Sequence, residues 1–154
     1  MRTWKLGYEK AKKKALETYS SIGILQCPAL GGEAVHFTRI GFSHLVRKGK
    51  NPRTRTEQKK RFVLVQHVTK ILSNPDVAIE YRKEERVILV DRRGEKIVAT
   101  SVAEFWTCVE KIEDCTVKVV VRQLDTGGPK HFFSVMGDNV TVTSGKPRNK
   151  KSRS

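Results

Sequence analysis

Apolar residues recur with a helical period in two segments of the first half of the chain. Residues 3–20 carry apolar side chains at imperfect helical spacing, which predicts an amphipathic helix. A second helix is predicted over about 57–73, where Thr56 can cap the first turn. Asn74 should end this helix, because the proline that follows disfavours helical backbone. The apolar stripe of the second helix consists of Phe62, Val65, Val68, Thr69 and Leu72.

The segment between these helices changes its pattern twice. Residues 22–33 contain glycine and proline and predict a connection. Val35 and Phe37 then alternate with His36 and Thr38, as in a half-buried strand. Gly41 interrupts the alternation, and Ser43 can cap a short basic helix. This arrangement predicts that His44 lies at a helix start.

From residue 77 onward the period is two, which predicts a meander of antiparallel strands. Turns are expected at 92–94, 113–114 and 125–129, and residues 95–103 are ambiguous. The predicted fold is α+β, with two or three N-terminal helices packed on one face of a C-terminal antiparallel meander sheet of about four to five strands. The strands are expected at 77–81, 86–91, 104–112, 116–124 and 130–136.

Three parts of the chain follow from this pattern. Residues 1–33 are interpreted as an N-terminal helix and linker, and residues 34–138 as an α+β domain. Residues 139–154 form a tail rich in Lys, Arg and Ser, which is expected to be disordered.

The net charge of +15 over 154 residues is concentrated in two places. Residues 1–70 hold 16 Lys or Arg against 4 Asp or Glu, and residues 145–154 hold 5 against none. Residues 71–144 are nearly neutral, with 10 against 12. A basic half of this kind favours a polyanion such as nucleic acid, because neutralised phosphates release counterions. Solubility or attraction to acidic lipid is the alternative explanation.

Several classes of protein are disfavoured by composition. The sequence has no run of the roughly 20 apolar residues that a membrane-spanning helix needs. The first residues lack the apolar core of a secretory signal, so a cytoplasmic location is expected. Cys27, Cys108 and Cys115 have no metal-ligand spacing and are interpreted as buried or free thiols. Neither a metal nor another cofactor is predicted.

The first candidate for chemistry is His44. Imidazole titrates near neutral pH and can therefore take or give a proton, although packing at a helix end is an equally open role. Residues 47–61 follow with eight Lys or Arg and a single acid, Glu57. This run is interpreted as contacting phosphate, with a solvated face as the alternative. His67 is interpreted as structural. The candidate nucleic-acid ligands in the run are Arg47, Lys48, Lys50, Arg53 and Arg55.

Strand alternation adds candidates from the C-terminal half. In the penultimate strand, Lys118 and Arg122 lie on the face opposite the valines of the core. The same parity predicts Phe132 and Ser134 beside Arg122 and places His131 on the core face. A face with cations, a hydroxyl and an aromatic ring can hold a phosphate and stack a base. An ordinary polar outer face is the alternative.

The order of these parts resembles the barnase, colicin tRNase and RelE-like superfamily of small metal-independent ribonucleases, especially its branch in phage and mobile elements. In such proteins a helix-borne histidine, a basic residue on the penultimate strand and a hydroxyl residue on the last strand line the cleft. His44, Arg122 and Ser134 stand at the corresponding places. Barnase-type members also use a carboxylate base, and no obvious counterpart is present. The similar segments are strand-Gly-x-x-His at 35–44, Ser-Asn-Pro at 73–75, Val-Lys-Val-Val-Val-Arg at 117–122 and Phe-Phe-Ser-Val at 132–135.

The resemblance implies cleavage of RNA by attack of a 2′-hydroxyl on the adjacent phosphate, giving a 2′,3′-cyclic phosphate without a metal. His44 would transfer the proton, either from the 2′-hydroxyl or to the leaving 5′-oxygen. Arg122, and secondarily Arg47, would stabilise charge on the phosphate, and Ser134 would orient it. Arg82 is a further candidate cation, and His131 is a reserve acid or base.

Two other interpretations remain open. A non-catalytic RNA- or DNA-binding module would need only the basic half and the tail. A toxin-like or phage-encoded nuclease with an acidic immunity or antitoxin protein as partner is compatible with ribonuclease activity. Candidate RNA partners are tRNA and mRNA, and a membrane partner is not expected.

Overall fold

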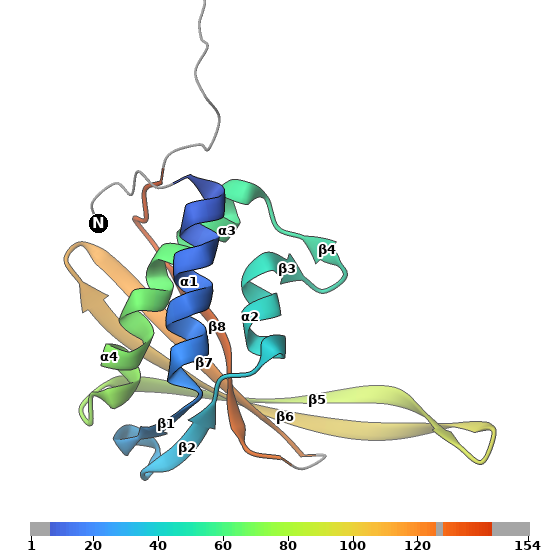
Figure 1. Cartoon of the computed structure of the whole chain (residues 1–154). Coiled ribbons are helices and arrows are strands. Elements are labelled where there is room, and N and C mark those ends of the chain that lie inside the picture. The colour runs from blue at the N-terminus through green and yellow to red at the C-terminus, as the bar shows by residue number, and fades with distance from the viewer. Residues whose placement is uncertain (1–6, 126–127, 143–154) are drawn as a thin grey trace, which may run out of the picture.

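The computed structural model describes residues 7–125 and 128–142, which form an α+β fold (Figure 1). None of the described helices is long and apolar enough to cross a membrane. The helices are α1 (Tyr8–Ile22), η1 (Pro28–Leu30), α2 (Arg39–Val46), α3 (Arg55–Leu64), η2 (Val65–His67) and α4 (Val68–Ser73). The strands are β1 (Ile24–Cys27), β2 (Glu33–His36), β3 (Arg47–Lys48), β4 (Asn51–Pro52), β5 (Ala78–Arg92), β6 (Glu95–Ile112), β7 (Cys115–Leu124) and β8 (Lys130–Gly137).

Six of these strands form one mostly antiparallel sheet in the order β1-β2-β8-β7-β6-β5. Only β2 and β8 run parallel among the described strands. The α+β prediction is confirmed, but the sheet is larger than predicted. The segment expected to be a connection folds as the hairpin of β1 and β2, and Gly31 and Gly32 supply the left-handed backbone that its turn requires. Because β1 and β2 lie between α1 and α2, the helices are not a separate N-terminal block.

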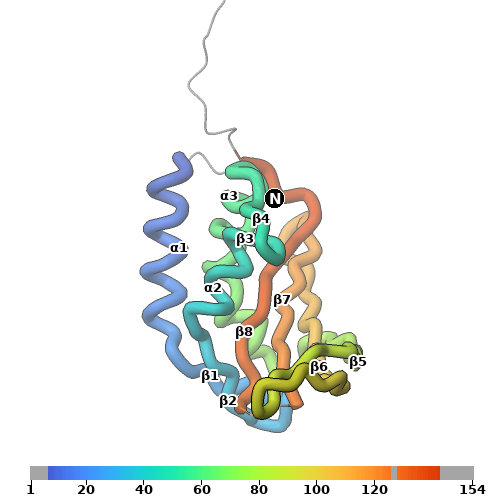
Figure 2. Tube along the Cα trace, turned by 90° about the vertical axis from the view of Figure 1, so that its right-hand side faces the viewer, coloured from blue at the N-terminus to red at the C-terminus, as the bar shows by residue number. Residues whose placement is uncertain are grey.

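Helix α1 packs on the body of the protein through residues spaced four apart. Ala11, Ala15 and Tyr19 are buried, so one stripe of the helix faces the core. Residues 3–6 of the predicted helix lie outside the described residues. Figure 2 shows α1, α2 and α3 on one side of β7 and β6, with α1 farthest from these two strands.

The second predicted helix is divided into α3, η2 and α4. Thr54 caps α3 by accepting a hydrogen bond from the backbone N–H of Glu57 at 3.1 Å, so the cap is two residues earlier than predicted. The predicted apolar stripe is buried except for Thr69, which is exposed. The helical segment ends at Ser73, before Asn74 and Pro75, as predicted.

Helix α2 begins at Arg39 with Thr38 at the cap position, so Gly41 lies inside the helix. A Cβ on Gly41 would lie 2.6 Å from the carbonyl oxygen of Phe132 and would also collide with the hydroxyl of Tyr19. Glycine at this position therefore allows α2 to pack closely against Tyr19 and Phe132 and does not interrupt the helix. As a consequence His44 lies in the last turn of α2, and the prediction that it lies at a helix start is wrong.

Strands β5 and β6 form one continuous antiparallel hairpin from Ala78 to Ile112, including the segment 95–103 that the sequence left ambiguous. The outer half of the hairpin projects from the body as an arm (Figures 1 and 2). Most of its apolar residues are exposed, and 74% of Val87 is accessible to solvent. The turn predicted at 92–94 is formed by Arg93 and Gly94 alone, because Arg92 still belongs to β5, and the predicted turn at Glu113-Asp114 is confirmed.

A bulge in β8 changes which side chains face the core. Val120 pairs with Ser134, but Val121 pairs with Phe132, so Phe133 is an extra residue on β8. Phe132 is fully buried in the core. An extra residue shifts a strand's alternation by one, so Phe132 leaves the Arg122 face and His131 joins it. The predicted positions of both residues are therefore wrong.

The remaining predictions concern the core and the tail. The valines of β7 at positions 117, 119 and 121 are buried, as predicted. Cys27, Cys108 and Cys115 are buried and form no disulfide, which agrees with the interpretation as buried or free thiols. Val140 packs against the core, whereas residues 143–154 of the predicted tail lie outside the described residues.

Candidate functional site

One row of paired residues crosses the outer face of the sheet, the face opposite the main core. The pairing places Arg82 opposite Phe105, Phe105 opposite Arg122, and Arg122 opposite His131. His131 in turn pairs with His36 of β2. Paired residues point to the same side of a sheet, so three residues that the sequence singled out, Arg82, Arg122 and His131, lie in one line.

Arg122 is held by His131 and by an aromatic ring. Its Nε donates a hydrogen bond to Nε2 of His131 at 3.1 Å, and its guanidinium carbon lies 4.6 Å from the centre of the Phe133 ring. Burial and the charge of Arg122 lower the pKa of His131, whereas a hydrogen bond to the backbone of Pro129 acts to raise it. A neutral His131 that accepts at Nε2 carries its proton on Nδ1. His131 therefore orients the guanidinium of Arg122.

The imidazole of His44 packs against the ring of Phe133. Its ring centre is 4.3 Å from that of Phe133, so Phe133 contacts both His44 and Arg122. Burial, followed by the charges of Arg122 and Arg53, lowers the pKa of His44. Its Nε2 is buried and has no hydrogen-bond partner among the described residues. A neutral imidazole with an unsatisfied ring nitrogen is able to accept a proton.

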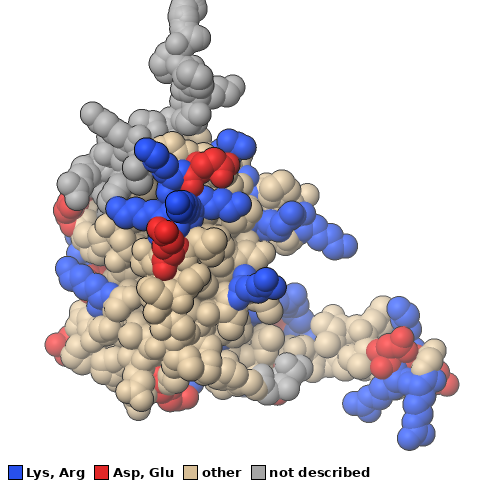
Figure 3. Space-filling view, viewed as in Figure 1, with Lys and Arg blue, Asp and Glu red and all other residues tan. Residues whose placement is uncertain are grey.

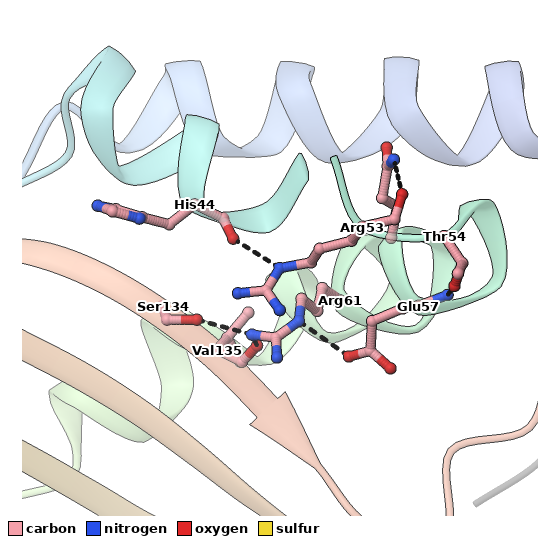
Figure 4. Close-up of polar contacts among 8 residues, drawn as sticks. His44, Arg53, Thr54, Glu57, Arg61, Ser134 and Val135 are labelled. Carbon is pink, nitrogen blue, oxygen red and sulfur yellow. Dashed lines mark hydrogen bonds and ion pairs between the residues drawn. The ribbon is translucent and has the colours of Figure 1, made fainter. Parts of the chain in front are cut away.

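Two arginines from the segment after α2 complete the site (Figure 4). Nε of Arg53 donates to the backbone oxygen of His44 at 3.0 Å. Nε of Arg61 forms an ion pair with Glu57 at 3.0 Å, and its Nη1 donates to Oγ of Ser134 at 2.8 Å. The charge of Arg61 contributes to lowering the pKa of Arg53, after burial. Arg53 is thus held against the backbone of His44, and Arg61 is held between Glu57 and Ser134.

Ser134 does not lie on an open surface. Only 3% of the residue is accessible to solvent, and its hydroxyl accepts the hydrogen bond from Arg61. The sequence predicted that this hydroxyl lines the cleft and orients a phosphate. In the folded chain its contact is with Arg61, which it helps to hold in place.

The remaining candidates form a wider basic surface. Arg47, Lys48 and Lys50 are exposed on the β3–β4 hairpin. Figure 3 shows a hollow between this hairpin and the β5–β6 arm, with Lys and Arg side chains on both sides. Arg55 lies apart, over the ring of Tyr8 at 4.4 Å. The other two candidates belong to the sheet: Arg82 lies over Phe105 and pairs with Glu84 at 3.0 Å, and Lys118 is half-buried.

Four residues of the site were not identified from the sequence. The position of His36 could have been found, because it alternates with the buried Val35 in β2. The position of Phe133 could not have been found, because it depends on the bulge in β8. Arg61 was counted in the basic run but not assigned a role. Nothing in the pattern indicated that Arg86 lies near Arg122, where burial first and the charge of Arg86 second lower the pKa of Arg122.

The arrangement combines a neutral imidazole, fixed guanidinium groups and an aromatic ring, which together can bind a phosphodiester and remove a proton beside it. In the described part of the chain, no three His, Cys, Asp or Glu side chains are grouped so that they could hold a metal ion. Comparisons with protein-family models, curated proteins and solved structures find no match to this chain.

Proposed function

We propose that the protein is a metal-independent endoribonuclease that cleaves RNA by attack of a 2′-hydroxyl on the adjacent phosphate. The observation that most supports this proposal is the neutral imidazole of His44, whose Nε2 lacks a partner and which is influenced by the charges of Arg122 and Arg53. The resemblance of the sequence to the barnase, colicin tRNase and RelE-like superfamily favours the same reaction.

In the proposed reaction His44 is the general base. Because Nε2 is buried, a 2′-hydroxyl reaches it only when the side chains around the ring move aside, and the hydroxyl then becomes the partner of Nε2 and loses its proton to it. The bond from the 2′-oxygen to phosphorus forms as the bond from phosphorus to the 5′-oxygen breaks, and water supplies a proton to the departing 5′-oxygen. The products are a 2′,3′-cyclic phosphate and a 5′-hydroxyl.

Arg122 and Arg53, whose charges lower the pKa of His44, would stabilise the charge that gathers on the phosphate in the transition state. Arg122 is preorganised by His131 and Phe133, and Arg53 by its hydrogen bond to the backbone of His44. Fixed cations in a partly buried site stabilise such charge without reorganising during the reaction. The exposed basic residues of the β3–β4 hairpin would bind the flanking RNA backbone through a salt-dependent interaction.

The experiment that tests this function is incubation of the purified protein with an RNA oligonucleotide in excess EDTA. We expect cleavage, with 2′,3′-cyclic phosphate ends detected by mass spectrometry. An oligonucleotide of the same sequence with 2′-O-methyl groups is the matched control and should remain intact, because it has no nucleophile. Cleavage that requires a divalent metal would contradict the proposal. Binding without cleavage would support the alternative of a non-catalytic RNA-binding module.

The pH dependence of cleavage should follow the lowered pKa of His44. The active form of a general base is deprotonated, so the rate should rise with pH through this pKa and level off near neutrality. Because burial and the arginines lower the pKa, the rise should lie below histidine's usual value of about 6.5. Arg53→Ala removes one of these charges and should move the rise to higher pH.

The pH measurement needs a control variant in which a positive charge outside the candidate site is removed. Lys70→Ala removes an exposed charge on α4 and should leave the midpoint of the rise unchanged. NMR titration of His44 in the same variants would measure the pKa directly. A rise that stays at the same pH in Arg53→Ala would show that the charge of Arg53 does not act on the base.

A further inference from the structure

A pocket of about 250 Å³ opens at one end of the row of paired residues. Its outer walls are Ile40 from α2 and Leu124 and Pro129 from the two sides of the β7–β8 connection. Its inner wall contains Arg122 and His131, which also belong to the candidate active site, and His36 from β2. The pocket is therefore continuous with the place where the phosphate is expected.

The chemistry of the walls suits a flat heteroaromatic ring. The aliphatic side chains offer apolar contact, and the two imidazoles offer stacking surface. The imidazole of His36 also offers a hydrogen-bonding edge. Ile40 is 61% exposed at this pocket, although a large apolar side chain gains nothing by contact with water. A ligand that covered Ile40 would remove this apolar surface from solvent.

The position of Arg122 adds a geometric requirement. In a nucleotide the base and the phosphate are joined through one ribose, so a cation that binds the phosphate must lie beside the pocket that binds the base. Arg122 contacts Phe133 in the candidate active site and also lines the pocket. Unpaired RNA bases are commonly recognised by stacking and by hydrogen bonds to their edges.

We propose that this pocket binds the nucleobase of the nucleotide next to the cleaved phosphate, and so contributes to the base preference of the enzyme. The proposal rests on the ribonuclease function for the identity of that phosphate. It also assigns a role to His36 and Ile40, which have none in the chemical step.

The test measures binding of nucleoside monophosphates to the full chain by NMR or calorimetry, with ribose 5-phosphate as the probe that lacks a base. We expect at least one of the four nucleotides to bind roughly tenfold more tightly than ribose 5-phosphate, since stacking of a base on a protein surface has effects of this size. Ile40→Ala should weaken nucleotide binding several-fold and leave ribose 5-phosphate binding unchanged. Alanine is compatible with the helix at this position.

The matched control is Ile24→Ala. Ile24 is 59% exposed, close to the 61% of Ile40, but it belongs to β1 and does not line the pocket. Equal affinities for ribose 5-phosphate and all four nucleotides would overturn the proposal, as would an equal loss of binding in both variants. The assay involves no cleavage. Base-dependent binding without RNA cleavage would therefore support the proposed base pocket and contradict the ribonuclease function. RNA cleavage without base-dependent binding would support the ribonuclease function and contradict the base pocket.

Discussion

Replacing His44 by alanine is expected to lower the rate of RNA cleavage by about 10²–10⁴-fold, the usual contribution of general acid–base catalysis. The affinity for RNA should change little, because His44 is neutral and the exposed cations of the β3–β4 hairpin remain. Single-turnover cleavage of a labelled oligonucleotide measures the rate, and a filter-binding assay with a 2′-O-methyl oligonucleotide measures the affinity.

His67 provides the matched control for this substitution. It is also a half-buried histidine whose pKa is lowered by burial and then by the charge of Lys70, but it belongs to η2 and not to the candidate site. His67→Ala should therefore cleave RNA at nearly the original rate. If His44→Ala also retained that rate, the assigned base would be wrong. The protein would then be better described as a basic RNA-binding module.

Arg122→Ala should reduce cleavage by about 10²–10³-fold, the loss seen when one group that stabilises a developing negative charge is removed. Arg122 is expected to hold the phosphate, and its charge also lowers the pKa of His44 and of His131. The variant should therefore show two changes: a slower rate at all pH values and a higher pKa of His44. The first is measured by single-turnover kinetics and the second by NMR titration.

Arg122→Lys separates the charge of this residue from its geometry. Lysine keeps a positive charge but loses the Nε–H that donates to His131 and the planar group that stacks on Phe133. We expect a rate between those of the wild type and Arg122→Ala, with a pKa of His44 close to that of the wild type. Lys70→Ala should keep the original rate. An Arg122→Ala protein that is folded by circular dichroism and cleaves normally would exclude Arg122 from the mechanism.

Features that depend on local pattern could be predicted from the sequence. Alternating residues in β7 placed Arg122 opposite the buried valines at 117, 119 and 121, because side chains alternate across any regular strand. Pro75 ended the helical segment, and Glu113-Asp114 supplied a turn, for equally local reasons. The α+β class and the basic segment beside His44 could also be predicted from the order and composition of the chain.

Which side chains meet in the candidate site depends on packing between segments that are distant in the sequence. The bulge in β8 arises in its pairing with β7, and it moves His131 to the face of Arg122 and Phe132 into the core. Gly41 allows α2 to pack closely against Tyr19 and the backbone of Phe132, contacts with residues far away in the sequence. No local period records such contacts, so the surroundings of His44 and Arg122 depend on packing between distant segments.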